Sequence, residues 1–331
     1  MSKKRYFIAR ARLQSHLRRN WDDVHSWLVY GDLLQERGDP RGELITIEQA
    51  LRDGATGQQC VELEARRDGL RRRLLGPLAD LSHLTCRWEW GAVRHAAVSE
   101  PVRSFGQEGK AKGVLLPKIT KASTLEALLR RACACMLESL HLVVTWAPAP
   151  EACLQLLRRR PVTRLVLTRS DPAAVRRGLT NAQRQLAGIR ALDLSRCQLA
   201  LKGARVLARA RHLGGLEELA LAENNLDAGA LHELTSGHLT GLRRLDLSHN
   251  PVGDEGARVL ARAGALRELE LLDLRHTTIG DAGARSLAGS GNLAALRELR
   301  LWGSQVGPAG RAALLASAFL SDAVKNADLL G

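Results

Sequence analysis

Apolar side chains recur along the C-terminal part of the chain in one frame, L-x-x-L-x-L-x-x-(N/C/T/S)-x-(L/V/I). The frame starts at Ile189, Leu216, Leu242, Leu269 and Leu296, so successive copies are 27, 26, 27 and 27 residues apart. Its first, fourth and sixth positions alternate with outward positions as in a short strand. Position nineteen is leucine in all five copies. The pattern predicts a stack of repeats that share one aliphatic core.

The rest of each copy predicts a turn and then a helix. Position nine carries a small polar side chain that can bond backbone groups otherwise buried without a partner, namely Cys197, Asn224, Asn250, Thr277 or Ser304. An Ala-rich segment such as GDEGARVLARA (253–263) follows and predicts a helix. Strands stack about 4.8 Å apart whereas helices need about 8 to 10 Å, so the stack must curve with a parallel sheet on its concave side.

Weaker copies of the frame precede the regular ones. They begin at Leu137 and Val162, and a still weaker copy begins near Val93. The predicted α/β solenoid therefore covers residues 81–316, irregular over 81–187 and regular over 188–316. Residues 311–331 predict a helix that caps the array, with residues 317–331 as the C-terminal cap.

The repeats resemble the ribonuclease-inhibitor type of leucine-rich repeat over roughly residues 85–316, through segments such as NPVGDEGARVLA and TTIGDAGARSLA. This resemblance implies a horseshoe of strands and outer helices that binds proteins along its concave face. Two features depart from the pattern. Pro172 occupies position eleven of the Val162 copy, and Trp146 precedes a turn that contains proline.

Residues 1–80 lack this frame and instead carry apolar residues at helical spacing, which predicts a small all-α domain. Gly38 can end its second helix, Asp39 can cap the next one, and Pro40 suits the first helical turn. This domain is predicted either to provide a second docking surface or to cap the N-terminal end of the solenoid.

The run WLVYGDLLQERGDPRGELITIEQAL (27–51) resembles the bacterial repeat-companion family, a short domain that accompanies repeat arrays. The resemblance implies this architecture and no defined activity; Gly31 stands where alanine is usual. The run contains a dense group of charged residues that either forms a binding site or pairs its charges around a helix-turn-helix corner: Asp32, Glu36, Arg37, Asp39, Arg41 and Glu43.

The segment WEWGAV (88–93) follows this domain. Trp88 and Trp90 are expected on one side of a strand, as a lid over the open end of the solenoid. The alternative is a pair of rings that stack on a ligand.

Composition indicates an ordinary globular chain with an aliphatic core, since 45% of residues are hydrophobic and only 3% aromatic. The six cysteines lack the spacing of a zinc site or a disulfide framework, so they are interpreted as reduced thiols. No signal-like or membrane-spanning stretch is evident. These features predict a cytoplasmic protein that has no membrane partner.

The net charge of +14 is uneven, at about +3 over residues 1–80, +10 over 81–187 and +1 over 188–331. The basic middle segment supports an alternative function, as a nucleic-acid-binding subunit of a ribonucleoprotein or defence complex. The residues that would contact nucleic acid are Lys110, Lys112, Lys118, Lys121, Arg130, Arg131, Arg158, Arg159 and Arg160.

No catalytic constellation is visible in the sequence. GQEGKAK (106–112) has the wrong spacing for a phosphate loop, and HELTSGH (232–238) separates its histidines by six residues where a zinc helix needs four. Neither a cofactor, a metal nor a small-molecule substrate is therefore predicted, and the chain is not expected to be an enzyme.

The preferred function is an adaptor, inhibitor or sensor that holds a protein partner of mixed charge on the concave face. Trp302 is either its anchor or a ring that packs beneath the C-terminal segment. The predicted contact residues follow the strands and the turns after them: Arg164, Arg169, Asp193, Arg196, Glu218, Glu223, Arg244, Asp246, His249, Leu271, Asp273, Arg275, His276, Glu298, Arg300 and Trp302.

Overall fold

The computed structural model describes residues 3–81, 84–98, 127–128, 130–131, 134, 136–137, 139–142 and 162–326. The chain folds as two compact units, which divide between Leu140 and His141. Each unit is built on a different principle, and each is considered by itself.

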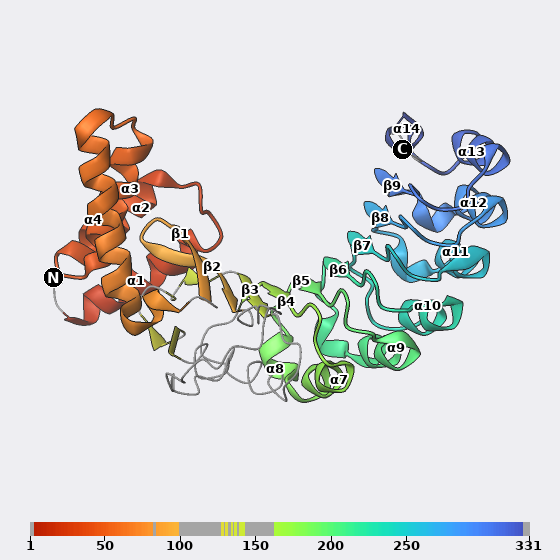
Figure 1. Ribbon diagram of the computed structural model, residues 1–331, viewed down its shortest axis with the longest axis horizontal. Coiled ribbons are helices and arrows are strands. Elements are labelled where there is room, and N and C mark those ends of the chain that lie inside the picture. The colour runs from red at the N-terminus through yellow and green to blue at the C-terminus, as the bar shows by residue number, and fades with distance from the viewer. Residues whose placement is uncertain are drawn as a thin grey trace, which may run out of the picture. The chain divides into compact units, whose positions relative to one another are not determined.

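The N-terminal unit begins with helices and continues into a hairpin (Figure 1). A 3-10 turn, Gly76–Asp80, joins the last of these helices to the hairpin. The elements are α1 (Lys3–Leu17), α2 (Val24–Gln35), α3 (Pro40–Arg52), α4 (Gly57–Leu75), β1 (Leu84–Glu89) and β2 (Ala92–Val98).

The corner between α2 and α3 is built as the sequence predicts. Gly38 adopts a φ of +67°, and Asp39 caps α3 by accepting a hydrogen bond from the Arg41 N–H, with Pro40 in the first turn. α3 packs closely on α2 at Gly42. No side chain fits there, because an added Cβ would lie only 2.5 Å from the Gly31 carbonyl oxygen. Both glycines therefore set the distance between the two helices.

The charged group at this corner mostly pairs within the unit. Arg41 is buried and forms an ion pair with Asp39, and Glu43 pairs with Arg66 of α4. Arg37 lies over the ring of Tyr6, 5.0 Å from its centroid. These contacts support the interpretation that the group fixes the geometry of the corner.

The hairpin completes the core of the N-terminal unit. Trp90 lies in its turn with a φ of +48°, is only 2% exposed, and stacks on Trp27 with ring centroids 6.0 Å apart. The neighbouring Gly91 leaves no room for a side chain, since a Cβ there would approach the Arg41 carbonyl oxygen to 2.7 Å. Trp90 thus closes the helical core.

This packing corrects one expectation for residues 84–98. Because Trp90 is buried among the helices, it cannot stack on a ligand beside Trp88. The lid over the open end of the solenoid stays a prediction. β2 contains Val93, pairs antiparallel with β1 and lies between β1 and β3 in the order of the sheet, so the weak copy near Val93 begins on a strand. The packing joins the hairpin to the helices, and the domain boundary at residue 80 stays a prediction.

The C-terminal unit alternates short strands with helices (Figure 1). β3 (Ser139–Leu142) spans the division between the units and lies where the Leu137 copy predicts a strand. The elements of the unit are β4 (Arg164–Val166), α7 (Pro172–Asn181), α8 (Gln183–Leu186), β5 (Ala191–Asp193), α9 (Ala200–Arg209), β6 (Glu218–Ala220), α10 (Ala228–Thr235), β7 (Arg244–Asp246), α11 (Gly253–Arg262), β8 (Leu271–Asp273), α12 (Asp281–Ala288), β9 (Glu298–Arg300), α13 (Pro308–Leu315) and α14 (Asp322–Asn326).

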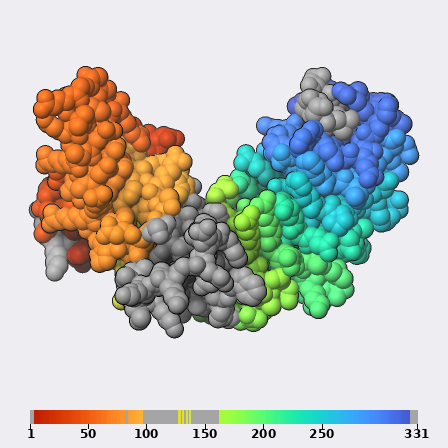
Figure 2. Space-filling model, viewed as in Figure 1, coloured from red at the N-terminus to blue at the C-terminus, as the bar shows by residue number. Residues whose placement is uncertain are grey.

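β4 to β9 form a parallel sheet in chain order. Leu165, Leu192, Leu219, Leu245 and Leu272 pair in turn, so the register follows the predicted repeat length. The strands line the inner side of a curved stack and the helices its outer side (Figure 1). In Figure 2 the successive repeats appear as bands whose colour passes from green to blue. The predicted solenoid is confirmed.

The polar side chains at position nine form a buried ladder between repeats. Asn250 accepts hydrogen bonds from the backbone N–H groups of Asn224 and Leu226 and donates to the carbonyls of Leu221 and Leu247. Asn224 repeats the arrangement one copy earlier, where Cys197 lies. These bonds satisfy backbone groups that the core removes from water.

A second ladder joins the helices. Asp254 accepts hydrogen bonds from the N–H groups of Gly280 and Gly283 in the next repeat, and Asp281 does the same for Gly307 and Gly310. Each carboxylate therefore caps the helix that follows in the stack, where the helix dipole favours negative charge.

Both ends of the described solenoid depart from the regular frame. At the first end, α7 begins at Pro172, because Asp171 caps it and the missing N–H is harmless in the first turn. At the other end two helices, α13 and α14, replace the single helix expected over 311–331. Leu320 and Val324 of this end are buried, whereas residues 327–331 lie outside the described residues.

Candidate functional site

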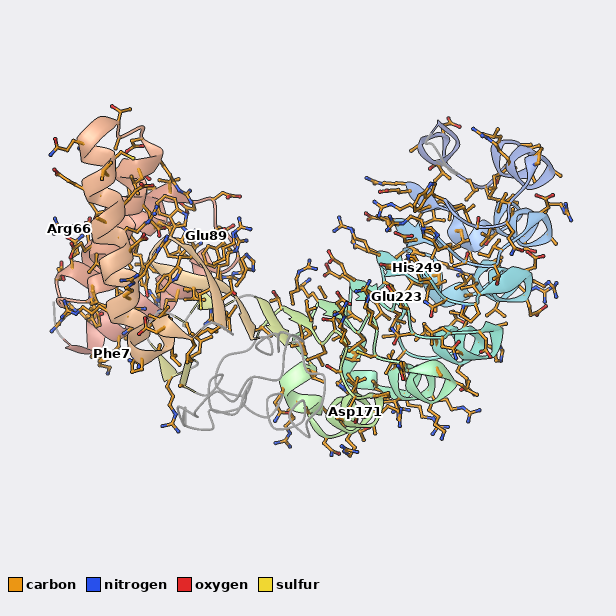
Figure 3. The ribbon with its side chains drawn as sticks, viewed as in Figure 1. Phe7, Arg66, Glu89, Asp171, Glu223 and His249 are labelled. Atoms are coloured by element: carbon orange, nitrogen blue, oxygen red, sulfur yellow. The ribbon has the colours of Figure 1, made fainter. Side chains whose placement is uncertain are left out.

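The outward positions of β4 to β9 form the concave face, and the residues that follow each strand form its carboxyl edge (Figure 3). The two surfaces together contain all sixteen residues predicted to contact a partner. They hold equal numbers of opposite charges, because the set includes six arginines and six carboxylates. The site is thus electrically balanced as a whole.

Many of these charged side chains form ion pairs between neighbouring repeats or strands. Glu218 on β6 accepts from Arg164 on β4 at 2.7 Å and from Arg244 on β7 at 2.8 Å. At the carboxyl edge Arg196 pairs with Glu223 at 2.7 Å. Because these side chains are between a quarter and two thirds exposed, the pairs add little stability and can exchange for a partner's charges.

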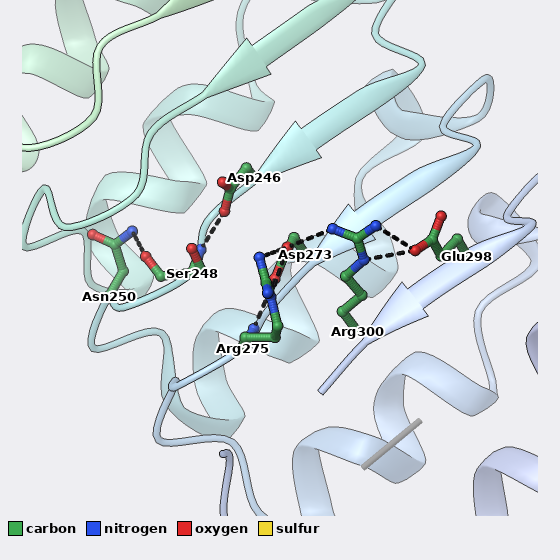
Figure 4. A network of polar contacts seen from close by, with 7 residues as sticks. All are labelled: Asp246, Ser248, Asn250, Asp273, Arg275, Glu298 and Arg300. Atoms are coloured by element: carbon green, nitrogen blue, oxygen red, sulfur yellow. Dashed lines mark hydrogen bonds and ion pairs between the residues drawn. The ribbon is translucent and has the colours of Figure 1, made fainter. Parts of the chain in front are cut away.

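The densest group of charges lies on β8 and β9 (Figure 4). Asp273 is only 2% exposed because Arg275 and Arg300 cover it, with N–O distances of 2.7 and 3.3 Å. Arg300 also bonds Glu298, and this hydrogen bond raises the pKa of Arg300. The hydrogen bond to Asp273 raises the pKa of Arg275. Both guanidinium groups are thereby held in fixed orientations toward solvent.

Residues at position eight turn the chain sharply off each strand. Arg169, Arg196, Glu223, His249 and His276 all have φ between +53° and +62°, the left-handed region. The same position in the last copy is Gly303, with a φ of +72°. In the five copies before the last, this backbone conformation presents one side chain of each repeat along the carboxyl edge.

Three rings stand in a row at this edge, and we call them the ring row: His249, His276 and Trp302. The imidazoles stack with centroids 4.3 Å apart, and His276 meets Trp302 edge to face at 4.5 Å. Gly303 makes room for this contact, since a Cβ there would lie 2.5 Å from Nδ1 of His276. Trp302 is 47% exposed, so about half of its surface is open to solvent.

Small side chains leave a hollow in the concave face. Val166, Ala191, Ala220 and Ala222 occupy outward positions on β4 to β6 and beyond. Three of these residues line a groove of about 250 Å³, which runs along the strands from Arg164 to Arg300. The sequence analysis omitted these residues because it selected charged and aromatic ones. Their small size within the outward columns was the available signal.

Most residues proposed to contact nucleic acid lie outside the described part of the chain. Of that set the structure describes Arg130 and Arg131. Arg130 is exposed, and the guanidinium of Arg131 lies beside Gly76. The described residues therefore do not assemble a basic surface from this segment.

Two of the described thiols are weakly reactive, and the described residues hold no metal cluster. Burial raises the pKa of both Cys86 and Cys197 to about 11, so these thiols stay protonated and weakly nucleophilic at neutral pH. Cys133, Cys135 and Cys153 lie outside the described residues. Within the described ranges no three His, Cys, Asp or Glu side chains are placed to bind one metal ion. No helix described there has the length and apolar character needed to span a membrane.

The geometry defines a leucine-rich-repeat solenoid behind an N-terminal helical region. A family model described as leucine-rich repeat matches residues 189–208, 238–261 and 266–288. These segments lie in the regular part of the frame, so the C-terminal unit is composed of leucine-rich repeats. Proteins of this architecture generally serve as interaction modules.

Solved structures similar to the chain include two internalins from Listeria monocytogenes. Internalin C2 is 22% identical, with a TM-score of 0.36, over 58% of this chain and 71% of its own. A second internalin, inlF, is 14% identical, with a TM-score of 0.32, over 59% of this chain and 62% of its own. No curated protein matches the sequence.

Proposed function

We propose that the chain is a non-catalytic interaction module that binds a protein partner on its concave face and carboxyl edge. The observation that carries this proposal is the ring row, with Trp302 almost half exposed beside oriented arginines. Tryptophan and arginine are the residues most enriched at the energetic centres of protein interfaces. Rigid rings also lose little conformational entropy on binding.

The charge pattern supports a protein over a polyanion. Six carboxylates lie among the six arginines, so a phosphate backbone would meet repulsion along the whole face. A protein surface of mixed charge can instead exchange ion pairs with Glu218, Glu223 and the arginines beside them. The chain would then act as an adaptor, inhibitor or sensor, and its cytoplasmic location stays a prediction.

The test is recovery of the partner by the full-length tagged chain from its native cells, with and without nuclease. Trp302→Ala should weaken the complex by about 30-fold, because truncation of an anchoring ring typically costs about 2 kcal/mol. Arg205→Ala is the control, since Arg205 lies on the outer helix α9, away from the concave face, and forms an ion pair with the partly exposed Glu233. This control should retain the partner.

Two results would overturn the proposal. One is a partner that Trp302→Ala and His276→Ala retain as well as the unaltered chain does. The other is a complex that nuclease treatment dissolves, which would favour the nucleic-acid function. Thermal unfolding of each variant shows that any loss arises at the surface, because both rings are exposed.

A further inference from the structure

The solvent-facing side of α1 combines exposed apolar side chains with strong positive charge. Phe7 and Ile8 are 53% and 46% exposed, and Figure 3 shows Phe7 at the surface of the N-terminal unit. At about 100° per residue, Ile8 lies opposite the inward-facing Tyr6 and Leu17. Phe7 lies about 100° from Ile8, and its exposed ring meets the buried ring of Tyr6 edge to face, with centroids 5.5 Å apart. Ile8 therefore lies on the outer face of the helix, and Phe7 lies on the flank between this face and the core.

Basic residues surround this pair without any carboxylate on the same helix. Residues 3–21 contain seven lysines and arginines and no Asp or Glu. Five of the seven are exposed around the apolar pair: Lys4, Arg5, Arg12, Arg18 and Arg19. The nearest acidic residues in sequence are Asp22 and Asp23, and Asp23 bonds His16 at 2.7 Å.

The chemistry that matches this surface is a plane that offers dense negative charge above an apolar layer. Cations near an anionic lipid surface are attracted to its headgroups, and large apolar side chains can enter the boundary with the acyl chains. A nucleic-acid backbone would use the cations but would leave Phe7 and Ile8 without apolar contacts. A helix of 15 residues with this charge lies on a bilayer and cannot span it.

We propose that the outer face of α1 docks on an anionic membrane surface, with Phe7 and Ile8 inserted and the surrounding cations on the headgroups. The interaction is reversible and needs both components. Each cation that reaches the surface strengthens binding by about fivefold, and two half-exposed side chains add a comparable apolar contribution. This docking is separate from the concave face and does not depend on the proposed protein partner.

The experiment measures sedimentation of the full chain with vesicles of phosphatidylcholine, alone or mixed with phosphatidylserine. Mixed vesicles should bind at least about tenfold more tightly, and binding should weaken as salt rises. Phe7→Ser/Ile8→Ser and Lys4→Glu/Arg12→Glu should each reduce binding by about tenfold or more.

Matched controls come from the exposed side of α4. Val61 is 65% exposed, and Arg72 and Arg73 are exposed cations, so Val61→Ser and Arg72→Glu/Arg73→Glu repeat the same chemical changes elsewhere in this unit. Both controls should bind within about twofold of the unaltered chain if α1 makes the contact. Thermal unfolding confirms that all variants fold.

Three outcomes would overturn the proposal. The first is equal binding to both kinds of vesicle. The second is full retention of binding by the α1 variants, which would place the contact elsewhere in the basic chain. The third is a loss with Lys4→Glu/Arg12→Glu but none with Phe7→Ser/Ile8→Ser, together with competition by a generic RNA duplex, which would make nucleic acid the partner.

Discussion

The two units of the chain reach a stable core by opposite means. In the N-terminal unit single large rings from distant segments meet once, as Trp21 and Trp27 do with Trp90. In the C-terminal unit the same small set of contacts recurs in every copy, and buried leucines fill equivalent places. In a repeated frame, each copy makes contacts equivalent to those of the next copy. In a unique core, each contact occurs once and has no equivalent elsewhere in the unit.

This difference determines how far the loss of stability caused by one substitution extends through each unit. A repeat contacts chiefly its neighbours, so loss of one contact loosens adjacent copies and leaves distant ones intact. A core in which a few rings touch one another fails as a whole, because no equivalent contact exists elsewhere. Three changes test the contrast, and they are ordered by the size of the expected effect.

Trp27→Ala should have the largest effect. The ring is fully buried, donates a hydrogen bond from Nε1 to the Trp21 carbonyl at 2.9 Å, and stacks on Trp90. Its loss should destabilise the N-terminal unit by about 3 to 5 kcal/mol. Hydrogen exchange on the full chain should show faster exchange throughout the helices and hairpin and no change over residues 189–316.

Trp302→Ala is the control, because it removes an exposed ring of the same kind. Faster exchange in both units with Trp27→Ala would contradict the idea that the two cores are independent.

Asn250→Ala should have an intermediate and graded effect. It would leave the buried N–H groups of Asn224 and Leu226 without acceptors, which costs about 2 to 3 kcal/mol. Amide exchange should increase most in the copies before and after Asn250 and decline with distance along the stack. The exposed Thr278 offers Thr278→Ala as a control with little change. Uniform exchange across all copies would contradict the expected local response.

A change of pH should have the smallest effect, and the two units should lose stability in different pH ranges. Burial lowers the pKa of His212 below its ordinary value of 6.5, so the unfolded chain binds the proton more readily. The stability of the C-terminal unit is therefore highest above pH 6.5 and falls as the pH drops below that value. His212→Gln should flatten this dependence in denaturant unfolding followed from pH 7.5 to 5.

The N-terminal unit should respond only at lower pH. The hydrogen bond from His16 and the Ser26 N–H lower the pKa of Asp23 to about 2 from an ordinary 3.8. Stability from Asp23 is present above pH 3.8 and is lost as the pH falls toward 2. Loss of this unit before the solenoid between pH 7 and 5 would reverse the predicted order.

Much of the solenoid could be predicted because its signals are local and repeated. The frame located β5 to β9 with their register, and the polar residue at position nine indicated the ladder of Asn224 and Asn250. The corner of α2 and α3 was equally readable, since Gly38, Asp39 and Pro40 each act on the backbone next to them. The outward columns located the candidate face for the same reason.

Contacts between distant segments could not be predicted in this way. The sequence placed Trp88 and Trp90 on one side of a strand, because they are separated by one residue, whereas Trp90 lies in the turn of a hairpin and is buried. The left-handed conformation at position eight and the hollow over Ala191 and Ala220 were missed, since neither has a distinctive sequence.

The sequence by itself determined the repeat length, the buried leucine positions, the parallel sheet and the helix caps. Each of these features depends on residues that are close together in the sequence. Only the tertiary structure decided that the hairpin belongs to the helices, that Trp302 is exposed beside His276, and that Arg275 and Arg300 share Asp273. These features depend on which side chains meet across the fold. Contacts between residues far apart in the sequence depend on their distance in the folded chain, which their sequence spacing does not give.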